Sequence, residues 1–418
     1  MIRSLKGTYD ILPDESWRWQ ALEAQLHDFM SIYGYKEIRT PAFEKTELFS
    51  RGVGEETDIV SKEMYTWLDG GKTNLTLKPE LTAPVVRAYI QHNLGALSPV
   101  TKLYYMDALF RRERPQKGRQ RQFHQFGVEA LGTPFPEADA EVIAIAYEFM
   151  VSLGITNLKL KLNSIGSGQC RDSYKDALKE YLSPHVQELS ETSRLRFETN
   201  PLRILDTKIE HEIVLLVKAP DILDFLTEED ETHFSEVREL LDGMKIPYVL
   251  DKRMVRGLDY YTRTTFEITS SALGSQDALC GGGRYDKLVE TLGGKSTPAV
   301  GFAAGVERLL IALDEIGKTE EPSKTDIYFV GLGDQARKAG IKLVHDLRKQ
   351  GYKSNYDLVR RSMKAQMREA NKSGARILLI LGDQELENNQ IQIKDLENSQ
   401  QMTINLDELK NHLYKLEL

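Results

Sequence analysis

One short segment holds the side chains of this sequence that are best suited to binding an anion. Residues 111–121, RRERPQKGRQR, contain six arginine and lysine residues against the single acid Glu113, which gives a net charge of +5. The whole chain of 418 residues has a formal charge of −8. Because guanidinium groups present paired N–H donors to oxyanions, the segment indicates an anion-binding loop, with a solvated hairpin tip as the alternative.

The stretches that flank this loop have the residue pattern of paired strands. Residues 101–110 and 122–131 predict a long antiparallel hairpin with the basic loop at its tip. Neighbours on a strand point to opposite faces, so alternate residues of the second strand share one face: Phe123, Gln125, Gly127 and Glu129. This row of side chains favours a binding surface on which Gly127 leaves room for a ligand. Arg111 ends the first strand within reach of that surface.

Three glycine-rich stretches do not meet the requirements of a nucleotide-binding motif. GGKT at 70–73 and GGKS at 293–296 resemble the end of a phosphate-binding loop, but Thr66 and Val289 stand where its first glycine is required. GLGDQA at 331–336 follows a predicted strand and opens a helix. A lone fingerprint of this kind is weak support for a dinucleotide site.

The composition is that of an ordinary globular protein, with 41% hydrophobic and 28% charged residues. The two cysteines, Cys170 and Cys280, form no paired motif, which argues against a disulfide framework or a zinc site and fits a reducing cytosol. The N-terminal residues lack the apolar stretch of a signal peptide, and no segment is long and apolar enough to span a bilayer. We therefore expect a cytoplasmic protein without membrane association.

The hydrophobic pattern and the polar stretches divide the chain. An amphipathic helix is expected over residues 14–35, and the polar, helical stretch at about 168–250 is expected to be an insertion. A polar hinge at 317–325 separates residues 1–325 from residues 326–418, whose alternating strands and helices predict an α/β domain with a partly parallel sheet.

The second of these domains contains most of the positive charge. Residues 337–376 hold twelve lysines and arginines against three acids, so their net charge is +9 and the rest of the chain carries −17. This segregation favours a polyanionic partner such as nucleic acid, and solvated helix faces are the alternative.

Residues 110–129, FRRERPQKGRQRQFHQFGVE, resemble motif 2 of the class II aminoacyl-tRNA synthetases, in the form found in the histidyl-tRNA synthetase family. The resemblance covers nearly the whole chain, through the following stretches: KGTYDILP at 6–13, TPAFEKTELF at 40–49 (motif 1), KPELTAPVVR at 78–87, RGLDYYTRTTFE at 256–267, GGGRYD at 281–286 and AVGFAAGVERL at 299–309 (motif 3). Motif 2 and RGLDYYT together are very specific.

This resemblance implies a fold and a reaction. The fold would be an α+β catalytic domain, with an antiparallel sheet flanked by helices and an insertion module, followed by an α/β anticodon-binding domain. The reaction would be the ATP-dependent ligation of histidine to its tRNA through a histidyl-adenylate. ATP would be a substrate that brings Mg²⁺ with it, without a dedicated protein site for the metal. A homodimer is also implied.

The resemblance assigns roles to individual residues. For ATP, Arg111 would hold the α-phosphate, Arg119 and Arg308 the pyrophosphate end, Phe123 and Arg308 the two faces of adenine, and Glu113 its amine. Glu80, Thr82 and Gln125 would surround the α-ammonium group of histidine. Arg256 would face the carboxylate and the α-phosphate. The imidazole would be enclosed by Glu129, Tyr260, Tyr261 and Tyr285, with Glu129 and Tyr261 pairing its nitrogens.

The loop tip and two departures complete these expectations. Gln116 and Lys117, at a turn formed by Pro115 and Gly118, would contact the acceptor end of tRNA. Leu81 stands where the family usually has glycine. Arg112 stands where the family often has histidine, and we expect it to point away from the ligand.

Two other functions remain open at this stage. One is a synthetase-like regulatory subunit of ATP phosphoribosyltransferase, the first enzyme of histidine biosynthesis. Such subunits usually lack parts of motif 2 and the C-terminal domain, and this chain has both. The other is a class II synthetase for a different amino acid, which RGLDYYT and the position of Glu129 oppose.

Overall fold

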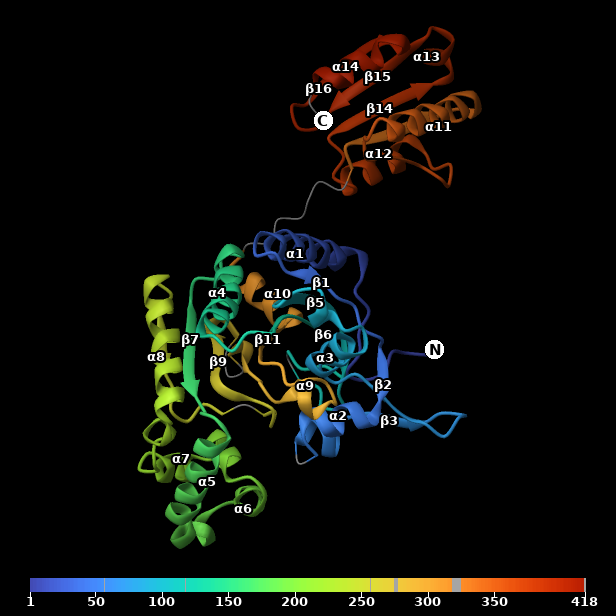
Figure 1. The fold of residues 1–418 in the computed structure, drawn as a ribbon. Helices are drawn as coiled ribbons and strands as arrows, with labels where there is room; N and C mark the ends of the chain where they lie inside the picture. Colours follow the sequence, from blue (N-terminus) through green and yellow to red (C-terminus); the bar gives the residue numbers. More distant parts are fainter. Residues whose placement is uncertain (56, 117, 256, 274–276, 318–324, 417–418) are drawn as a thin grey trace. The chain divides into compact units, whose positions relative to one another are not determined.

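The computed structural model describes residues 1–55, 57–116, 118–255, 257–273, 277–317 and 325–416. The chain forms two compact units, Met1–Thr319 and Glu320–Leu418 (Figure 1). Most of the hinge expected at 317–325 lies outside the described residues.

The first unit is built on an eight-stranded sheet. Its strands are, in order across the sheet, β1 (Lys36–Glu37), β5 (Thr101–Phe110), β6 (Gln122–Leu131), β11 (Ala299–Gly305), β10 (Ala278–Arg284), β9 (Thr262–Ser270), β7 (Leu158–Ser164) and β8 (Tyr248–Leu250). Neighbouring strands are antiparallel except at the two edges, where β1 with β5 and β7 with β8 are parallel. The expected hairpin is confirmed, since β5 and β6 pair from Phe110 opposite Gln122 to Thr101 opposite Leu131.

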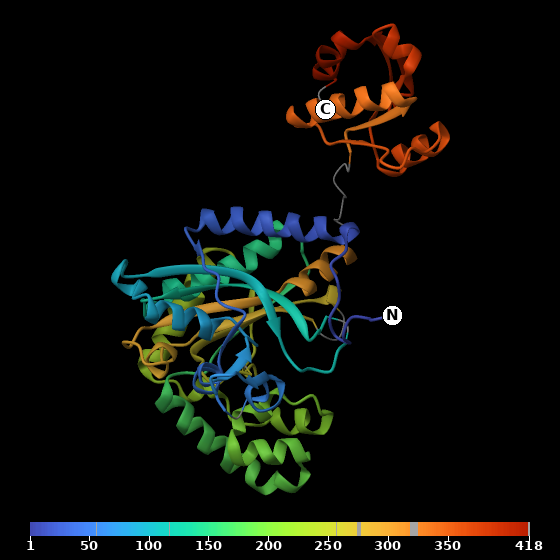
Figure 2. The same cartoon turned by 90° about the vertical axis from the view of Figure 1, so that its right-hand side faces the viewer.

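Helices cover both faces of this sheet, which confirms the expected fold class. One face packs against α1 (Pro13–Ile32), α4 (Pro136–Ser152), α8 (Glu228–Gly243) and α10 (Val306–Glu315). The other face packs against α3 (Thr82–Gln91) and α9 (Leu288–Thr291). In Figure 2, α1 lies along one side of the sheet and the green helices of the insertion lie on the opposite side. The helix expected at 14–35 is α1, which ends three residues earlier, just before Gly34.

The alternation along β6 is also confirmed. Phe126, Val128 and Ala130 are buried in the core beneath α1 and α4. Phe123 packs against the other core, beneath α3. The hydrophobic pattern of this strand therefore decides which of its side chains can face a ligand.

A small sheet lies beside the main one, with the order β2 (Phe43–Lys45), β4 (Asn74–Leu77) and β3 (Tyr65–Leu68). It leads into α2 (Thr46–Val53) and the single π-helical turn Ile59–Glu63. One of its faces presents Phe43 and Trp67, which are 51% and 39% exposed and have ring centroids 5.9 Å apart. Leu68, which follows Trp67 on the strand, is exposed on the other face.

Only the first part of the stretch 168–250 packs as a separate module. The helices α5 (Gly168–Leu182), α6 (Glu191–Thr199) and α7 (Glu210–Leu216) form a core of their own with the 3₁₀ turn Pro201–Asp206. In contrast, α8 sends Phe234, Val237 and Leu241 into the main core, and β8 pairs with β7. The helical period of α8 was visible in the sequence, but the period alone does not say which core a helix joins.

The second unit has a five-stranded sheet in the order β13 (Ser354–Tyr356), β12 (Ile327–Leu332), β14 (Ile377–Gly382), β15 (Gln390–Asp395) and β16 (Gln400–Asn405). The first three strands are parallel and the last two form an antiparallel hairpin. Its helices are α11 (Asp334–Lys349), α12 (Met363–Lys372), α13 (Asp383–Glu387) and α14 (Leu409–Lys415). The expected partly parallel sheet is confirmed.

Candidate active site

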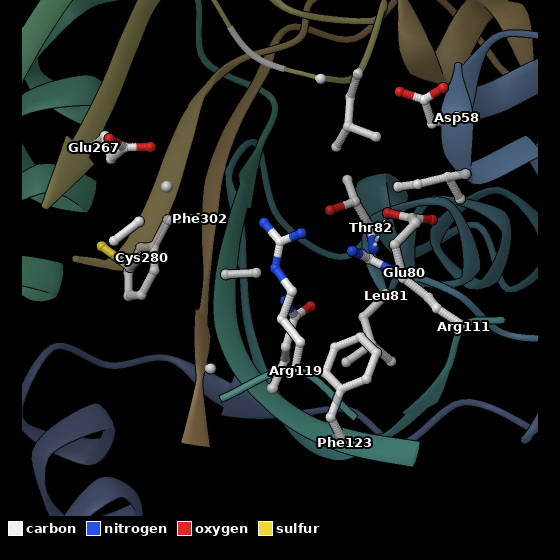
Figure 3. Close-up of a pocket in the computed structure, with 18 of the residues that line it drawn as sticks. Asp58, Glu80, Leu81, Thr82, Arg111, Arg119, Phe123, Glu267, Cys280 and Phe302 are labelled. Atoms are coloured by element: carbon white, nitrogen blue, oxygen red, sulfur yellow. Dashed lines mark hydrogen bonds between the residues drawn. The ribbon is translucent and has the colours of Figure 1, made fainter. Parts of the chain in front are cut away.

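A cavity of about 440 Å³ opens above the antiparallel strands of the first unit, a size typical of small-molecule sites. It is lined by most of the residues that the sequence singled out: Glu80, Thr82, Arg111, Glu113, Arg119, Phe123, Gln125, Tyr260, Tyr261, Tyr285 and Arg308. Figure 3 shows Glu80, Thr82 and Arg111 together on one side of the cavity, with Glu267 and Cys280 on the other.

Glu80 is held by the first turn of α3. The backbone N–H groups of Thr82 and Ala83 each donate to its carboxylate at 2.9 Å. Helix N-termini leave such N–H groups without a partner in the helix and favour negative charge. Burial nevertheless raises the pKa of Glu80 to about 7, against these two hydrogen bonds and the nearby Arg111. The carboxyl group is therefore poised to gain or lose a proton near neutral pH.

Leu81, between these residues, fits its position without the freedom of glycine. Its φ is −112°, an ordinary value for a side chain with a Cβ. The side chain is 2% exposed and packs in the core beneath α3. This departure from the family pattern therefore extends the core beside the cavity.

Glu129 lies beneath the cavity wall and is 1% exposed. Its Oε1 accepts hydrogen bonds from the Thr82 hydroxyl at 2.9 Å and from the Tyr105 hydroxyl at 3.0 Å, and its Oε2 accepts one from Tyr285. Burial raises the pKa of Glu129 to about 8, while the three hydroxyl donors lower it and Glu80 raises it further. Its expected contact with the imidazole ring stays a prediction.

The expectation that Gly127 leaves room for a ligand is wrong. Gly127 is opposite Tyr105 in the hairpin, and a Cβ on it would lie 2.6 Å from the Tyr105 hydroxyl and would overlap the carbonyl oxygen of Phe302. The missing side chain therefore makes space for the Tyr105 ring and for close packing of β11. The sequence analysis missed Tyr105, although the register of the hairpin would have paired it with Gly127.

Aromatic side chains form another wall of the cavity. The ring centroids of Tyr260 and Tyr261 are 4.7 Å apart, and those of Tyr260 and Tyr285 are 5.6 Å apart. Tyr261 is 5% exposed and also packs into the core of the insertion. The insertion therefore supports this wall directly.

Cationic side chains also line the cavity, and one of them, Arg111, lies beside Glu80 (Figure 3). The Arg111 guanidinium lies 5.1 Å from the centroid of the Phe123 ring, and its Nε donates to the carbonyl of Pro79 at 2.8 Å. Glu113 lies between two cations, 3.7 Å from Arg111 and 3.6 Å from Arg119. In this structure Glu113 acts as their counter-ion, and its expected contact with adenine stays a prediction.

Arg308 joins the motif 2 loop to the sheet. It comes from the first turn of α10 and donates to the carbonyl oxygen of Ala278 at 2.6 Å and to that of Gly118 at 3.4 Å. Burial, together with the nearby Arg119, lowers the pKa of Arg308. Mutual repulsion of this kind is relieved when an anion enters, as expected of a phosphate-binding site.

The tip of the basic loop forms a tight turn. Gln116 and Arg119 exchange two backbone hydrogen bonds of 3.0 and 2.9 Å, and Gly118 between them has a φ of +72°. Gln116 is exposed and does not line the cavity. Arg112 is exposed and does not line the cavity either, in agreement with the expectation that it points away. Two further expected site residues, Lys117 and Arg256, lie outside the described residues.

The insertion contributes residues that the sequence analysis missed. Arg196, Arg203 and Asp206 line the cavity. Arg203 pairs with Asp58 at 3.0 Å, and Arg196 donates to the carbonyl of Arg203 at 3.0 Å. No motif or spacing in this polar helical stretch predicted a contact with the cavity. The insertion is brought to the cavity by tertiary packing, which the local pattern does not encode.

The described residues offer neither a metal site nor a membrane-spanning helix. No group of three or more His, Cys, Asp and Glu side chains among them could hold a metal ion. None of the helices formed by the described residues is long and apolar enough to cross a membrane.

Comparisons with known proteins agree with this geometry. Residues 7–309 match the family model of histidyl-tRNA synthetase, and residues 326–416 match that of an anticodon binding domain. A curated protein of Caldanaerobacter subterraneus subsp. tengcongensis, named histidine–tRNA ligase, is 46% identical over 98% of this chain and 99% of its own length. A protein of the same name from Staphylococcus aureus is 46% identical over 99% of this chain and 100% of its own length.

Solved structures give the same result. The crystal structure of apo S. aureus histidyl-tRNA synthetase matches with a TM-score of 0.84 and 41% identity, over 99% of both chains. A protein described as an ATP phosphoribosyltransferase regulatory subunit/histidyl-tRNA synthetase, from Bacillus halodurans, matches with a TM-score of 0.65 and 24% identity over 91% of this chain and 98% of its own. The second likeness shows the fold alone.

Proposed function

The chain belongs to the histidyl-tRNA synthetase family, and we propose that it ligates histidine to its cognate tRNA with ATP, through a histidyl-adenylate. The observation that supports this most is the arrangement of one cavity. Its arginines, Arg111, Arg119 and Arg308, suit a triphosphate, and the buried carboxylates Glu80 and Glu129 suit a cationic amino acid bound next to that triphosphate.

In the first step, a carboxylate oxygen of histidine attacks the α-phosphorus of ATP. A bond from oxygen to phosphorus forms, and the bond to pyrophosphate breaks. Arg111 stabilises charge on the α-phosphate, and Arg256 bridges the histidine carboxylate and the same phosphate. Arg119 and Arg308 bind the leaving pyrophosphate. Mg²⁺ enters with ATP as part of the nucleotide substrate.

The adenine ring stacks between Phe123 and Arg308, with Glu113 near its amine. The histidine substrate lies next to the carboxylates of Glu80 and Glu129. Glu80, Thr82 and Gln125 surround its α-ammonium group, since a carboxylate and two neutral acceptors suit a cation. Glu129 and Tyr261 pair the imidazole nitrogens, and Tyr260 and Tyr285 enclose the ring. Selection follows because another side chain would leave buried polar groups without partners.

In the second step, a terminal ribose hydroxyl of the tRNA attacks the carbonyl carbon of the adenylate, and AMP leaves. Gln116 and Lys117 contact the acceptor end at the loop tip. The basic segment 337–376 of the anticodon-binding domain binds the anticodon arm through its charge.

The protein acts in the cytoplasm as a homodimer. The exposed aromatic side chains Phe43 and Trp67, which contact each other on one face of the small sheet, support a dimer contact there. Exposed apolar side chains that lie next to one another are typical of protein–protein interfaces.

A regulatory role in histidine biosynthesis is less well supported. Relatives that match over the full length are named histidine–tRNA ligase, and the anticodon binding domain is present. The direct test is to charge total tRNA with labelled histidine in the presence of ATP. Acid-stable label in tRNA is expected, and its absence with a folded protein would contradict the proposal.

A further inference from the structure

Glu129 is oriented by hydroxyl groups from three different elements. Thr82 begins α3, Tyr105 is in β5, and Tyr285 follows β10. All three donate to the carboxylate of Glu129. A carboxylate has about four acceptor directions, so roughly one is left for a ligand.

The remaining acceptor direction of Glu129 is on Oε2, which lies next to the cavity wall. Among the described residues, Oε1 has two donors and Oε2 has one, the Tyr285 hydroxyl. Gly301 lines the cavity, and a Cβ on Gly301 would overlap Oε2 of Glu129. Only the absence of that side chain lets the oxygen sit so close to the wall.

Tyr105 differs from the other two donors in one respect. Thr82 and Tyr285 line the cavity, whereas Tyr105 does not and is 2% exposed. Tyr105 is opposite Gly127 in the hairpin, and a Cβ on Gly127 would lie 2.6 Å from the Tyr105 hydroxyl. Tyr105 therefore lies outside the cavity lining, and its hydroxyl donates to the Glu129 carboxylate at 3.0 Å.

We propose that Tyr105 is a positioning residue for histidine recognition, whose hydroxyl fixes the Glu129 carboxylate so that its remaining acceptor direction meets an imidazole N–H. This inference rests on the proposed function, in which Glu129 binds the imidazole ring. It adds the pair Tyr105 and Gly127 to the residues that determine specificity.

The physical effect of the hydroxyl has two parts. It holds Oε1 in place, and it stabilises the ionised carboxylate, because the hydrogen bond from Tyr105 lowers a pKa that burial raises to about 8. Removing the hydroxyl should therefore raise this pKa further and leave less of Glu129 in the ionised form, the stronger acceptor, at neutral pH. At high pH, Glu129 is ionised with or without the hydroxyl.

The chain offers a matched control on the same strand. Tyr105→Phe removes the hydroxyl in question. Tyr104→Phe removes the hydroxyl of the neighbouring residue, which points to the opposite face and lies 2.8 Å from His27 Nδ1. Both changes delete one oxygen from a largely buried tyrosine of β5.

The first measurement is histidine-dependent ATP–pyrophosphate exchange at several pH values. For Tyr105→Phe, the KM for histidine should rise about 3- to 10-fold near neutral pH, with the KM for ATP unchanged. The ratio to wild type should shrink at about pH 9, because both proteins then have an ionised Glu129. A merely structural defect would keep this ratio constant with pH. Tyr104→Phe should behave as wild type.

The second measurement needs no activity. Infrared difference spectra follow the titration of the buried carboxyl groups, and Glu129→Gln identifies the band of Glu129. The midpoint of that band should move to higher pH in Tyr105→Phe and stay in place in Tyr104→Phe. An unmoved midpoint, equal effects of both variants, or a Tyr105→Phe protein that does not fold would overturn the proposal. A shifted midpoint in a protein that does not activate histidine would instead contradict the proposed function.

Discussion

Glu80 and Glu129 are linked through a single residue, Thr82. Its backbone N–H donates to Glu80 and its hydroxyl donates to Glu129, both at 2.9 Å. Each carboxyl group is buried, and each has a raised pKa, to about 7 for Glu80 and about 8 for Glu129. In the free protein the two groups therefore compete for ionisation, and a cationic ligand between them favours the ionised form of both.

The pH dependence of histidine binding follows from this link. An ionised carboxylate accepts an N–H of the ligand more strongly than a protonated carboxyl group does, and only the ionised form attracts the α-ammonium group by charge. Affinity should therefore be low below the pKa values of about 7 and 8 and rise as pH increases through them. The KM for histidine, measured by pyrophosphate exchange between about pH 6 and pH 8.5, should fall as pH increases. A KM that is constant or increases over this range would contradict the account.

Arg111 and Arg112 should differ sharply although they are neighbours. Arg111 lines the cavity, whereas Arg112 is exposed and does not. Arg111→Ala should reduce kcat/KM for adenylate formation by about 100-fold or more, as expected when a group that stabilises transition-state charge is removed. Arg112→Ala should leave it within about 2-fold of wild type. Similar losses in both variants would show that the loop acts only through its net charge.

The loop tip should affect the second step alone. Gln116 is exposed on the turn and lies outside the cavity lining. Gln116→Ala and Lys117→Ala should spare pyrophosphate exchange and slow tRNA charging. The effect of Lys117→Ala should shrink as salt increases, because phosphate contacts release counterions. Normal charging by both variants at low salt would mean that the spare charge of the loop has no role in binding tRNA.

The first compact unit should suffice for adenylate formation, whereas the charging of tRNA should need both units. The second unit has its own cores on both faces of its sheet. Deleting residues 326–418 should leave part of the pyrophosphate exchange and strongly weaken the charging of tRNA. Charging that survives the deletion undiminished would show that the basic segment 337–376 is a solvated surface.

Local sequence patterns predicted a strand or helix well where the spacing of its apolar residues followed a single strand or helix period. The alternation along 122–131 correctly separated Phe126 and Val128, in the core, from Phe123, beside the cavity. The alternation of strands and helices in the second unit was predicted in the same way, whereas β13, α13 and α14 were not predicted. The hairpin of β15 and β16 was not predicted, although Ile391 and Ile393 alternate with polar residues and are buried, which is the pattern of a half-buried strand.

Contacts across elements were beyond these patterns. Gly127 was interpreted without its partner Tyr105, so its space was assigned to a ligand. Arg203 reaches Asp58, more than a hundred residues away in sequence, through packing that no local period encodes. The same holds for α8, which joins the main core rather than that of the insertion.

ATP–pyrophosphate exchange with each of the twenty amino acids in turn tests the central claim most directly. We expect exchange with histidine alone, because in the proposed function Glu129 and Tyr261 pair both imidazole nitrogens, and other side chains would leave these two residues unpaired. Glu129→Gln should weaken exchange with histidine without admitting another amino acid. Exchange with proline or threonine at an efficiency comparable to that with histidine would contradict the assignment of this cavity to histidine.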